Sequence, residues 1–525
     1  MTASDLFGAA ERLRRDGPGL LRAFVRSHRG ALSADLRFEV MFSRSSSAAD
    51  GEPRSALEGE SAGFCVSVCA GEGSGASGAA QTGVELGRLA LRSQPTVAAI
   101  RAALEEAYER ARLGAREKAA LLRTLGARGR SLADAAAAPR EPVRDAVPAV
   151  YRCDPRALAP DALGRLCHDA SARVAELGPE IAYNAIAATS ELREELFIGS
   201  DDTLISQCFS FSQGDCYVVA QSGDGHQEIY DSIGQQRGFE CLAEGWRDEL
   251  MPNPDLTTFA LALAGEARDL AAAPVLKPPA GEVTVVTDPH FNALLAHEIV
   301  GHPSEADRAL KMEAAYAGRS WFLRSLKDSE VGRRVGSPLL SACSDPTLHG
   351  FGHYRYDHEG TRGRRAMHIE NGIFRGFLNS RETAAVLGVE PNGSARASEV
   401  FYVPLIRMSN TFLLPGETDP RAIIGEVERG YYVCGSAVPS IAESRENFRI
   451  SARRVYEIEQ GRIGRLYRSG SVIADSKEFF SRIDAVGNDL RLIAIPNCGK
   501  GQPMQVKRMS NGGPTLRSRA RLGGG

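Results

Sequence analysis

Three clusters of turn-forming residues divide residues 196–232 into short β-prone runs. The clusters read GSDD, SQGD and SGDG, and the runs between them are rich in Phe, Ile, Val and Tyr. This alternation is typical of an antiparallel meander, and it constrains the fold more than any other stretch of the chain. Strands and turns also dominate the C-terminal half, whereas helical periodicity recurs before it, so we expect an α+β fold.

The first half of the chain carries the helical patterns. Apolar residues recur at spacings of three and four in 96–126, 160–177 and 255–273, which predicts amphipathic helices. A Gly/Ser/Ala-rich stretch at 70–83 is typical of a flexible loop, and the alanine- and proline-rich stretch near 132–145 is typical of a linker.

A domain boundary is expected near Pro279. There the helical pattern ends at KPPAG, and the apolar run EVTVVT predicts a strand over 282–287. We therefore divide the chain into an N-terminal α+β domain, 1–279, and a strand-rich C-terminal domain, 280–525.

Composition excludes several classes of protein. The chain has 525 residues, enough for two or three domains, with 63 basic and 66 acidic side chains. No positive excess would attract nucleic acid, and no apolar run is long enough for a signal peptide or a membrane span. Ten cysteines occur singly or as loose pairs. We expect a cytoplasmic protein that binds neither nucleic acid nor membrane.

The run HEIVGH places His297, Glu298 and His302 at the end of a predicted helix. Asp288 can cap that helix and Pro289 suits its first turn, so it should span about 289–300. The two histidines are five residues apart, one more than in the familiar zinc-protease motif.

On a continuous α-helix, side chains five residues apart lie about 140° apart, too far to share one ion. Either Gly301, in a left-handed conformation, and Pro303 end the helix between the histidines, or the helix widens locally to a π-helix. Glu298 falls about 20° from Phe291 in the buried stripe, where a carboxylate needs a partner or a metal. The alternative is an accidental His-Glu-His on a core helix.

A catalytic zinc ion needs a third protein ligand. Cys498 stands out because it follows the strand-like DLRLIAI in a predicted turn, PNCGKGQ, where Lys500 could favour the thiolate. A buried inert thiol is the alternative. The candidates by residue type are Glu305, Asp307, Glu313, His290, His353 and Cys498.

Several separate stretches together resemble the TldD/PmbA family of metallopeptidases, specifically its metal-bearing TldD branch. They are HEIVGH, DHEGT with IENGIFRGFLNSR, RMSNTFLLPG, and DAVGNDLRL followed by NCGKGQP. The resemblance covers roughly 180–525.

The resemblance implies that His297, His302 and Cys498 hold one zinc ion per chain and that Glu298 activates the attacking water. The metal-free TldE/PmbA branch lacks this site, so the chain resembles the catalytic subunit. The family implies hydrolysis of unfolded or modified peptides inside a dimer cavity, with a TldE/PmbA-like partner or a second copy of the chain.

Two segments depart from the family pattern, 349–357 and 431–447, and they favour an alternative substrate range: a dedicated amidase or peptidase that matures one natural-product peptide. A second alternative is a non-catalytic regulatory or partner subunit. An extended peptide could add to a sheet edge. Arg407, Asn410 and His353 are candidate substrate contacts.

Overall fold

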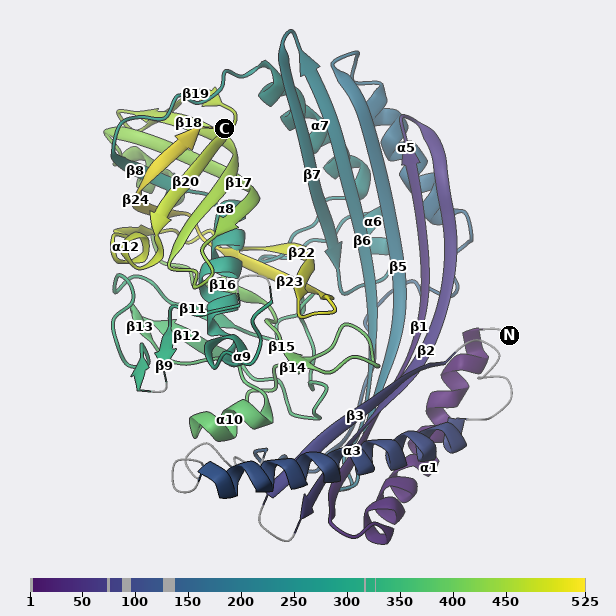
Figure 1. The fold of residues 1–525 in the computed structure, drawn as a ribbon. Coiled ribbons are helices and arrows are strands. Elements are labelled where there is room, and N and C mark those ends of the chain that lie inside the picture. The colour runs from purple at the N-terminus through teal and green to yellow at the C-terminus, as the bar shows by residue number, and fades with distance from the viewer. Residues whose placement is uncertain are drawn as a thin grey trace.

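The computed structural model describes residues 3–72, 76–86, 96–125, 137–315, 318–325 and 327–524. Its N-terminal part is a seven-stranded, mostly antiparallel sheet of long curved strands, in the order β3-β2-β1-β5-β6-β4 with β7 beside β6 (Figure 1). The strands are β1 (Ala31–Ala49), β2 (Glu52–Glu72), β3 (Ala76–Leu86), β4 (Arg144–Val147), β5 (Ile181–Gly199), β6 (Leu204–Ser222) and β7 (Gly225–Gln235). The predicted meander is β5, β6 and β7.

Two pairs of helices cover this sheet at opposite ends of its long strands (Figure 1). The helices α1 and α3 share one apolar core with β1 and β2, and α5 and α7 share another with β5 to β7. The helices are α1 (Ala3–Ser27), α3 (Thr96–Leu125), α5 (Ala162–Ala175), α6 (Glu240–Ala243) and α7 (Leu256–Ala272). The three predicted amphipathic helices are confirmed as α3, α5 and α7.

Two glycine-rich stretches that predict a loop or turn lie in strands. Within 70–83, the described residues belong to β2 and β3, and SQGD lies inside β6. A Cβ on Gly78 would lie 2.3 Å from the carbonyl oxygen of Ala111 in α3, and one on Gly214 would lie 2.5 Å from Leu256 of α7. These glycines allow helices to pack closely on the sheet, a function that composition does not distinguish from flexibility. Residues 132–136 of the predicted linker lie outside the described residues.

The C-terminal part contains two larger sheets, ordered β17-β8-β24-β20-β18-β19, with β21 beside β24, and β13-β12-β11-β16-β23-β22. Its strands are β8 (Glu282–Thr287), β9 (Leu323–Ser325), β10 (Asp328–Ser329), β11 (Ala342–Ser344), β12 (Ala366–Glu370), β13 (Ile373–Phe374), β14 (Ala395–Arg396), β15 (Leu405–Ile406), β16 (Thr411–Leu413), β17 (Arg429–Ile441), β18 (Asn447–Glu459), β19 (Arg462–Tyr467), β20 (Gly470–Asp475), β21 (Ala485–Val486), β22 (Arg491–Lys500), β23 (Gln505–Gly513) and β24 (Leu516–Gly524). Its α-helices are α8 (Pro289–Leu295), α9 (Ala306–Ala309), α10 (Arg381–Leu387), α11 (Pro420–Gly425) and α12 (Ser476–Ser481).

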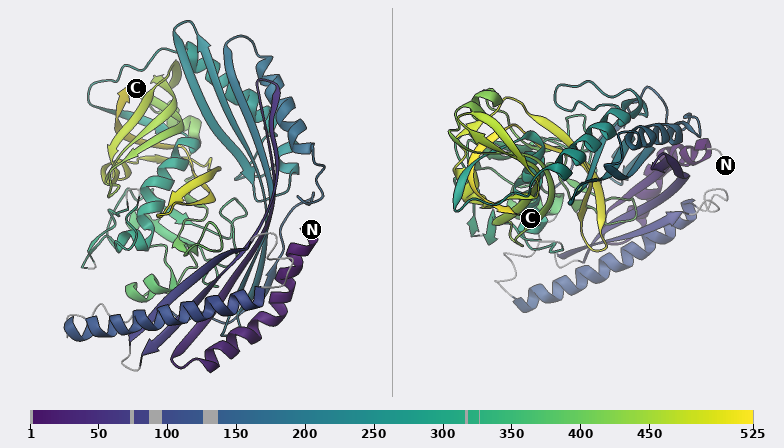
Figure 2. Two further views of the ribbon diagram at one scale, coloured as in Figure 1. Left: turned by 45° about the vertical axis from the view of Figure 1, so that its right-hand side comes forward. Right: turned by 90° about the horizontal axis from the view of Figure 1, so that it is seen from above.

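Helix α8 joins the two C-terminal sheets through one apolar core, to which Phe291 and Leu295 contribute. The hairpin of β22 and β23 extends from this core toward the long N-terminal sheet (Figures 1 and 2). The expected α+β architecture is confirmed, and the boundary at Pro279 stays a prediction. Among the described residues, no helix is long and apolar enough to cross a membrane.

Candidate metal centre

The HEIVGH segment is a π-helix. Helix α8 is capped by Asp288, whose carboxylate accepts the amide of Phe291, and has Pro289 in its first turn, as predicted. The chain then continues as a π-helix over Ala296–Gly301 and a 3-10 helix over His302–Ser304. The amide of His302 donates to the carbonyl of His297, the i to i+5 bond that defines a π-helix. The widening therefore brings histidines five residues apart onto one side.

Gly301 does not end the helix in a left-handed conformation, so that expectation is wrong. Its φ is −62°, within the right-handed helical region. Its role is close packing, because a Cβ on Gly301 would lie 1.9 Å from the sulfur of the buried Met408.

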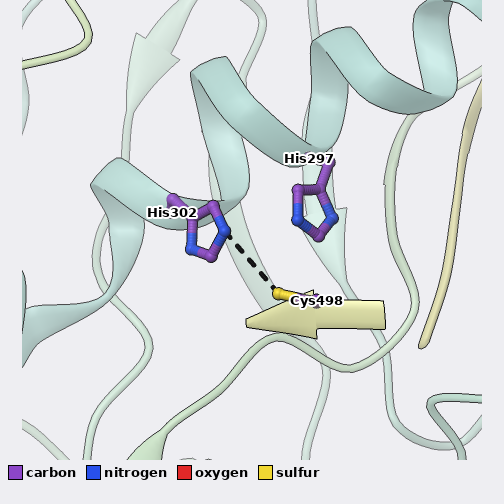
Figure 3. Close-up of side chains that lie close together, drawn as sticks. All are labelled: His297, His302 and Cys498. Atoms are coloured by element: carbon purple, nitrogen blue, oxygen red, sulfur yellow. Dashed lines mark hydrogen bonds between the residues drawn. The ribbon is translucent and has the colours of Figure 1, made fainter. Parts of the chain in front are cut away.

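His297, His302 and Cys498 converge in the core, and their ligand atoms all lie within 4.8 Å of one another. The Cys498 sulfur lies 3.6 Å from Nε2 of His302, across 196 residues of sequence (Figure 3). Within the described part of the chain, these three residues form the only such group of His, Cys, Asp or Glu side chains. Two imidazoles and a thiol suit zinc, with bond lengths of about 2.0–2.3 Å to each ligand.

Both imidazoles are oriented by bonds on the far side of the ring. Nδ1 of His297 lies 3.1 Å from Oδ1 of Asn511, and Nδ1 of His302 lies 3.0 Å from Glu305. The amide nitrogen of Asn511 donates to the carbonyl of Thr411, so its oxygen is the atom that accepts from His297. Each ring therefore keeps Nε2 for a metal, an arrangement typical of histidine ligands.

The environment of Cys498 favours its thiolate. Burial opposes ionisation, but His297, His302 and Arg407 outweigh it and hold the pKa of the thiol well below its usual value. Burial likewise acts to lower the pKa of His297, yet Cys498 raises that pKa to about 9. Each of these shifts favours the charged form of the group, so the thiolate and the imidazolium stabilise one another.

Lys500 does not act on the thiol as predicted. Its ammonium is fully buried and donates to Glu305 at 3.1 Å and Asp307 at 2.7 Å. The predicted turn is also wrong, since β22 continues through Cys498 to Lys500. Lys500 therefore acts indirectly: it holds the carboxylate of Glu305, which in turn orients His302.

Glu298 has one basic partner. Its side chain is 14% exposed and is paired with Arg445, which also donates to the Glu298 carbonyl at 3.1 Å. Burial acts to raise the pKa of Glu298, but Arg445 and the two histidines outweigh it and lower the pKa to about 2. The partner required by a carboxylate in the buried stripe is therefore an arginine from the segment after β17.

The C-terminal part of the chain, which contains the three converging residues, is similar to known proteins. Residues 280–521 match the family described as the PmbA/TldA metallopeptidase C-terminal domain. A metalloprotease of Methanothermobacter thermautotrophicus is 33% identical over 330 residues, which cover 63% of this chain and 67% of that protein. The chain belongs to the PmbA/TldD metallopeptidase family.

One further relative and two solved structures are also similar to this chain. A zinc metalloprotease TldD homologue of Saccharolobus solfataricus is 28% identical over 364 residues, covering 68% of this chain and 75% of its own. TldE from Thermococcus kodakarensis shares the fold with a TM-score of 0.66 at 18% identity, over 98% of this chain and 100% of its own. A protein of Thermotoga maritima titled a modulator of a DNA gyrase gives 0.69 at 16%, with the same coverage. The latter two likenesses concern the fold alone.

The remaining candidate ligands have other partners in this PmbA/TldD-family chain. His290 lies 3.3 Å from Asp231, and a carboxylate oxygen of Glu313 accepts the amide of Ala315. Nδ1 of His353 lies 2.7 Å from the carbonyl oxygen of Pro346. None of these three is among the residues that converge with His297.

The candidate substrate contacts occupy different places. Arg407 and Asn410 are fully buried, and both donate to main-chain carbonyls, Arg407 to that of Cys498. Arg407 thus holds the main chain at Cys498, and Asn410 holds the main chain at Asp345 and Leu348. His353 lines a cavity described below. Sequence reasoning missed Arg445 and Asn511, and the only signal for Arg445 was its place in the segment that departs from the family pattern.

Proposed function

We propose that this chain is a zinc-dependent peptidase that hydrolyses peptide bonds of unfolded or modified peptides. The observation that carries the proposal is the convergence of His297, His302 and Cys498, each imidazole already oriented from its far side. These residues would hold one zinc ion. When bound, zinc would polarise the scissile carbonyl and lower the pKa of the attacking water.

Glu298 is the proposed general base. It follows His297 directly, and its carboxylate is held by Arg445 beside the ligand group. Glu298 would take a proton from the attacking water and return it to the leaving amine. Arg445 would keep the carboxylate in one orientation, which matters because proton transfer depends on short, directed contacts.

The test combines metal content with turnover of a labelled unfolded peptide. We expect about one zinc per wild-type chain, none in Cys498→Ala, and zinc with turnover reduced about 100-fold or more in Glu298→Gln. His226→Gln, which removes a half-exposed histidine elsewhere, is the matched control and should change neither. Freshly prepared wild type with no metal, and none taken up on adding zinc, would overturn the proposal in favour of a regulatory or partner subunit.

A narrower substrate range is the second candidate. A dedicated amidase or peptidase for one natural-product intermediate would use the same residues, and the well-formed cavity of about 500 Å³ beside the β22–β23 hairpin favours it. Cleavage of assorted unfolded peptides would count against it.

We further propose that the enzyme works in the cytoplasm as a dimer, with a TldE/PmbA-like chain or a second copy. The likeness in fold to TldE supports a related partner. Mass measurement of the purified chain alone and after mixing with a TldE-like protein tests this, and a monomer under both conditions would contradict it.

A further inference from the structure

The cavity of about 500 Å³ lies where the two parts of the chain meet. Strands β5 and β6 form one wall, and the loop 351–358 and the β22–β23 hairpin form others. Aromatic side chains supply much of the apolar lining: Phe209, Phe211, Phe351, Tyr354, Tyr356 and Tyr402. Its size is that of a site for a small ligand or a short peptide segment.

Two of the carboxylates that line the cavity are satisfied within the protein. Glu191 is bonded to Arg193 and Arg508, each at 2.9 Å. Glu195 lies 3.0 Å from Nε2 of His358. A third lining carboxylate, Glu399, is exposed to solvent.

Two cationic groups of the lining lack such partners. Among the described residues, no carboxylate lies within 4.0 Å of the Lys507 ammonium, and no hydrogen bond satisfies it. Arg396 is 6% exposed, donates to the Met408 carbonyl, and leaves Nε without a partner. Its guanidinium carbon lies 4.4 Å from the centre of the Tyr354 ring, which restricts its orientation. A cationic group without a paired carboxylate is costly to bury, so the cavity is suited to an anionic group.

The position of Lys507 relates this cavity to the metal centre. Lys507 on β23 pairs in register with Cys498 on β22. Neighbouring strands lie about 4.8 Å apart, so the backbone that carries the free ammonium adjoins the backbone that carries the metal ligand. Pro496, two residues before Cys498, also lines the cavity.

We propose that Lys507 and Arg396 form a carboxylate-binding subsite that selects anionic peptide substrates. This inference rests on the proposed peptidase function and names its substrate class. The carboxylate can belong to the peptide's C-terminus or to an Asp or Glu side chain. Arg396 supplies a permanent positive charge, and Lys507 supplies a donor group that lines the cavity.

The test measures binding rather than cleavage. An N-terminally labelled alanine pentapeptide is offered to the zinc-loaded Glu298→Gln chain as a free acid, as a C-terminal amide, and as an amide with one Ala replaced by Asp. We expect at least one anionic peptide to bind about tenfold or more tighter than the neutral amide, the usual size of a hydrogen bond to a charged group. Preference for the free acid assigns the C-terminus, and preference for the Asp peptide assigns a side chain.

Adding Lys507→Met should remove this preference, and Lys507→Arg should retain it. Lys277→Met is the matched control, because it removes an exposed lysine outside the cavity. Equal affinity for the three peptides, or a preference that persists in Lys507→Met, would overturn the subsite and leave the peptidase proposal standing. Absence of zinc or of turnover in the wild type would overturn the peptidase proposal, and the binding measurement would still decide whether the cavity prefers an anionic peptide.

Discussion

The guanidinium of Arg445 is bonded to the carboxylate of Glu298, and the backbone of Arg445 has a conformation that residues other than glycine rarely adopt. Its φ is 63°, and its side chain is 4% exposed. A non-glycine residue in the left-handed region costs on the order of 1 kcal/mol or more, so the contact is maintained against local strain. Such strain is concentrated at functional sites.

Replacing Arg445 tests whether this contact positions the base. Arg445→Met should lower kcat/KM about tenfold or more with zinc retained, because Glu298 loses the group that orients its carboxylate. Arg445→Lys should recover part of the loss, since it restores the charge. The control is Arg319→Met, which breaks an exposed ion pair with Glu443. Full activity in Arg445→Met would refute the positioning role.

Gly301→Ala tests the packing of the π-helix. The added methyl would collide with the Met408 sulfur, so we expect a loss of about 1–3 kcal/mol in the free energy of unfolding, the usual cost of overpacking. In the control, Gly265→Ala on α7, a Cβ meets nothing within 4 Å and should be neutral or stabilising. Urea unfolding at constant pH compares the two variants, and equal stability would exclude the collision.

Local sequence chemistry predicts part of this site. The rest depends on contacts between residues that are far apart in the sequence. Asp288 and Pro289 act within one helical turn, so local chemistry predicts the start of α8. The spacing of His297 and His302 admits two geometries, and the local sequence does not choose between them. The glycine between them, Gly301, packs against Met408, more than 100 residues away. Long-range packing also places the described residues of the glycine-rich stretch at 70–83 in strands.

The residues that orient the metal ligands were not predicted, for the same reason. Asn511 lies 214 residues from His297 in sequence, and no local pattern marks an asparagine that orients a histidine.

Asn511→Leu should weaken zinc binding about 10–100-fold and leave the fold intact, because Nδ1 of His297 loses its acceptor. Competition with a chelator measures the affinity. Asn497→Leu, at an exposed neighbour of Cys498, should bind zinc like the wild type; equal affinities of both variants would contradict the role of Asn511.

Glu191 joins the two parts of the chain, since it lies on β5 and accepts from Arg508 on β23. Burial acts to raise the pKa of Glu191, but Arg193 and Arg508 outweigh it and lower the pKa from 4.5 to about 2. A lowered pKa in the folded state means that the ion pair stabilises the protein fully above the unfolded value. This contribution, on the order of 3 kcal/mol, is lost as the pH falls from about 5 toward 2.

Glu191→Gln should therefore be less stable than the wild type at pH 7, because two arginines lose their carboxylate. It should also lose less stability between pH 5 and pH 3, since the group that titrates is gone. Chemical unfolding followed at each pH measures both effects. Glu58→Gln, which breaks an ion pair whose carboxylate is 52% exposed, should keep the wild-type pH dependence. If Glu191→Gln loses as much stability as the wild type over this range, the acid sensitivity resides in other carboxylates.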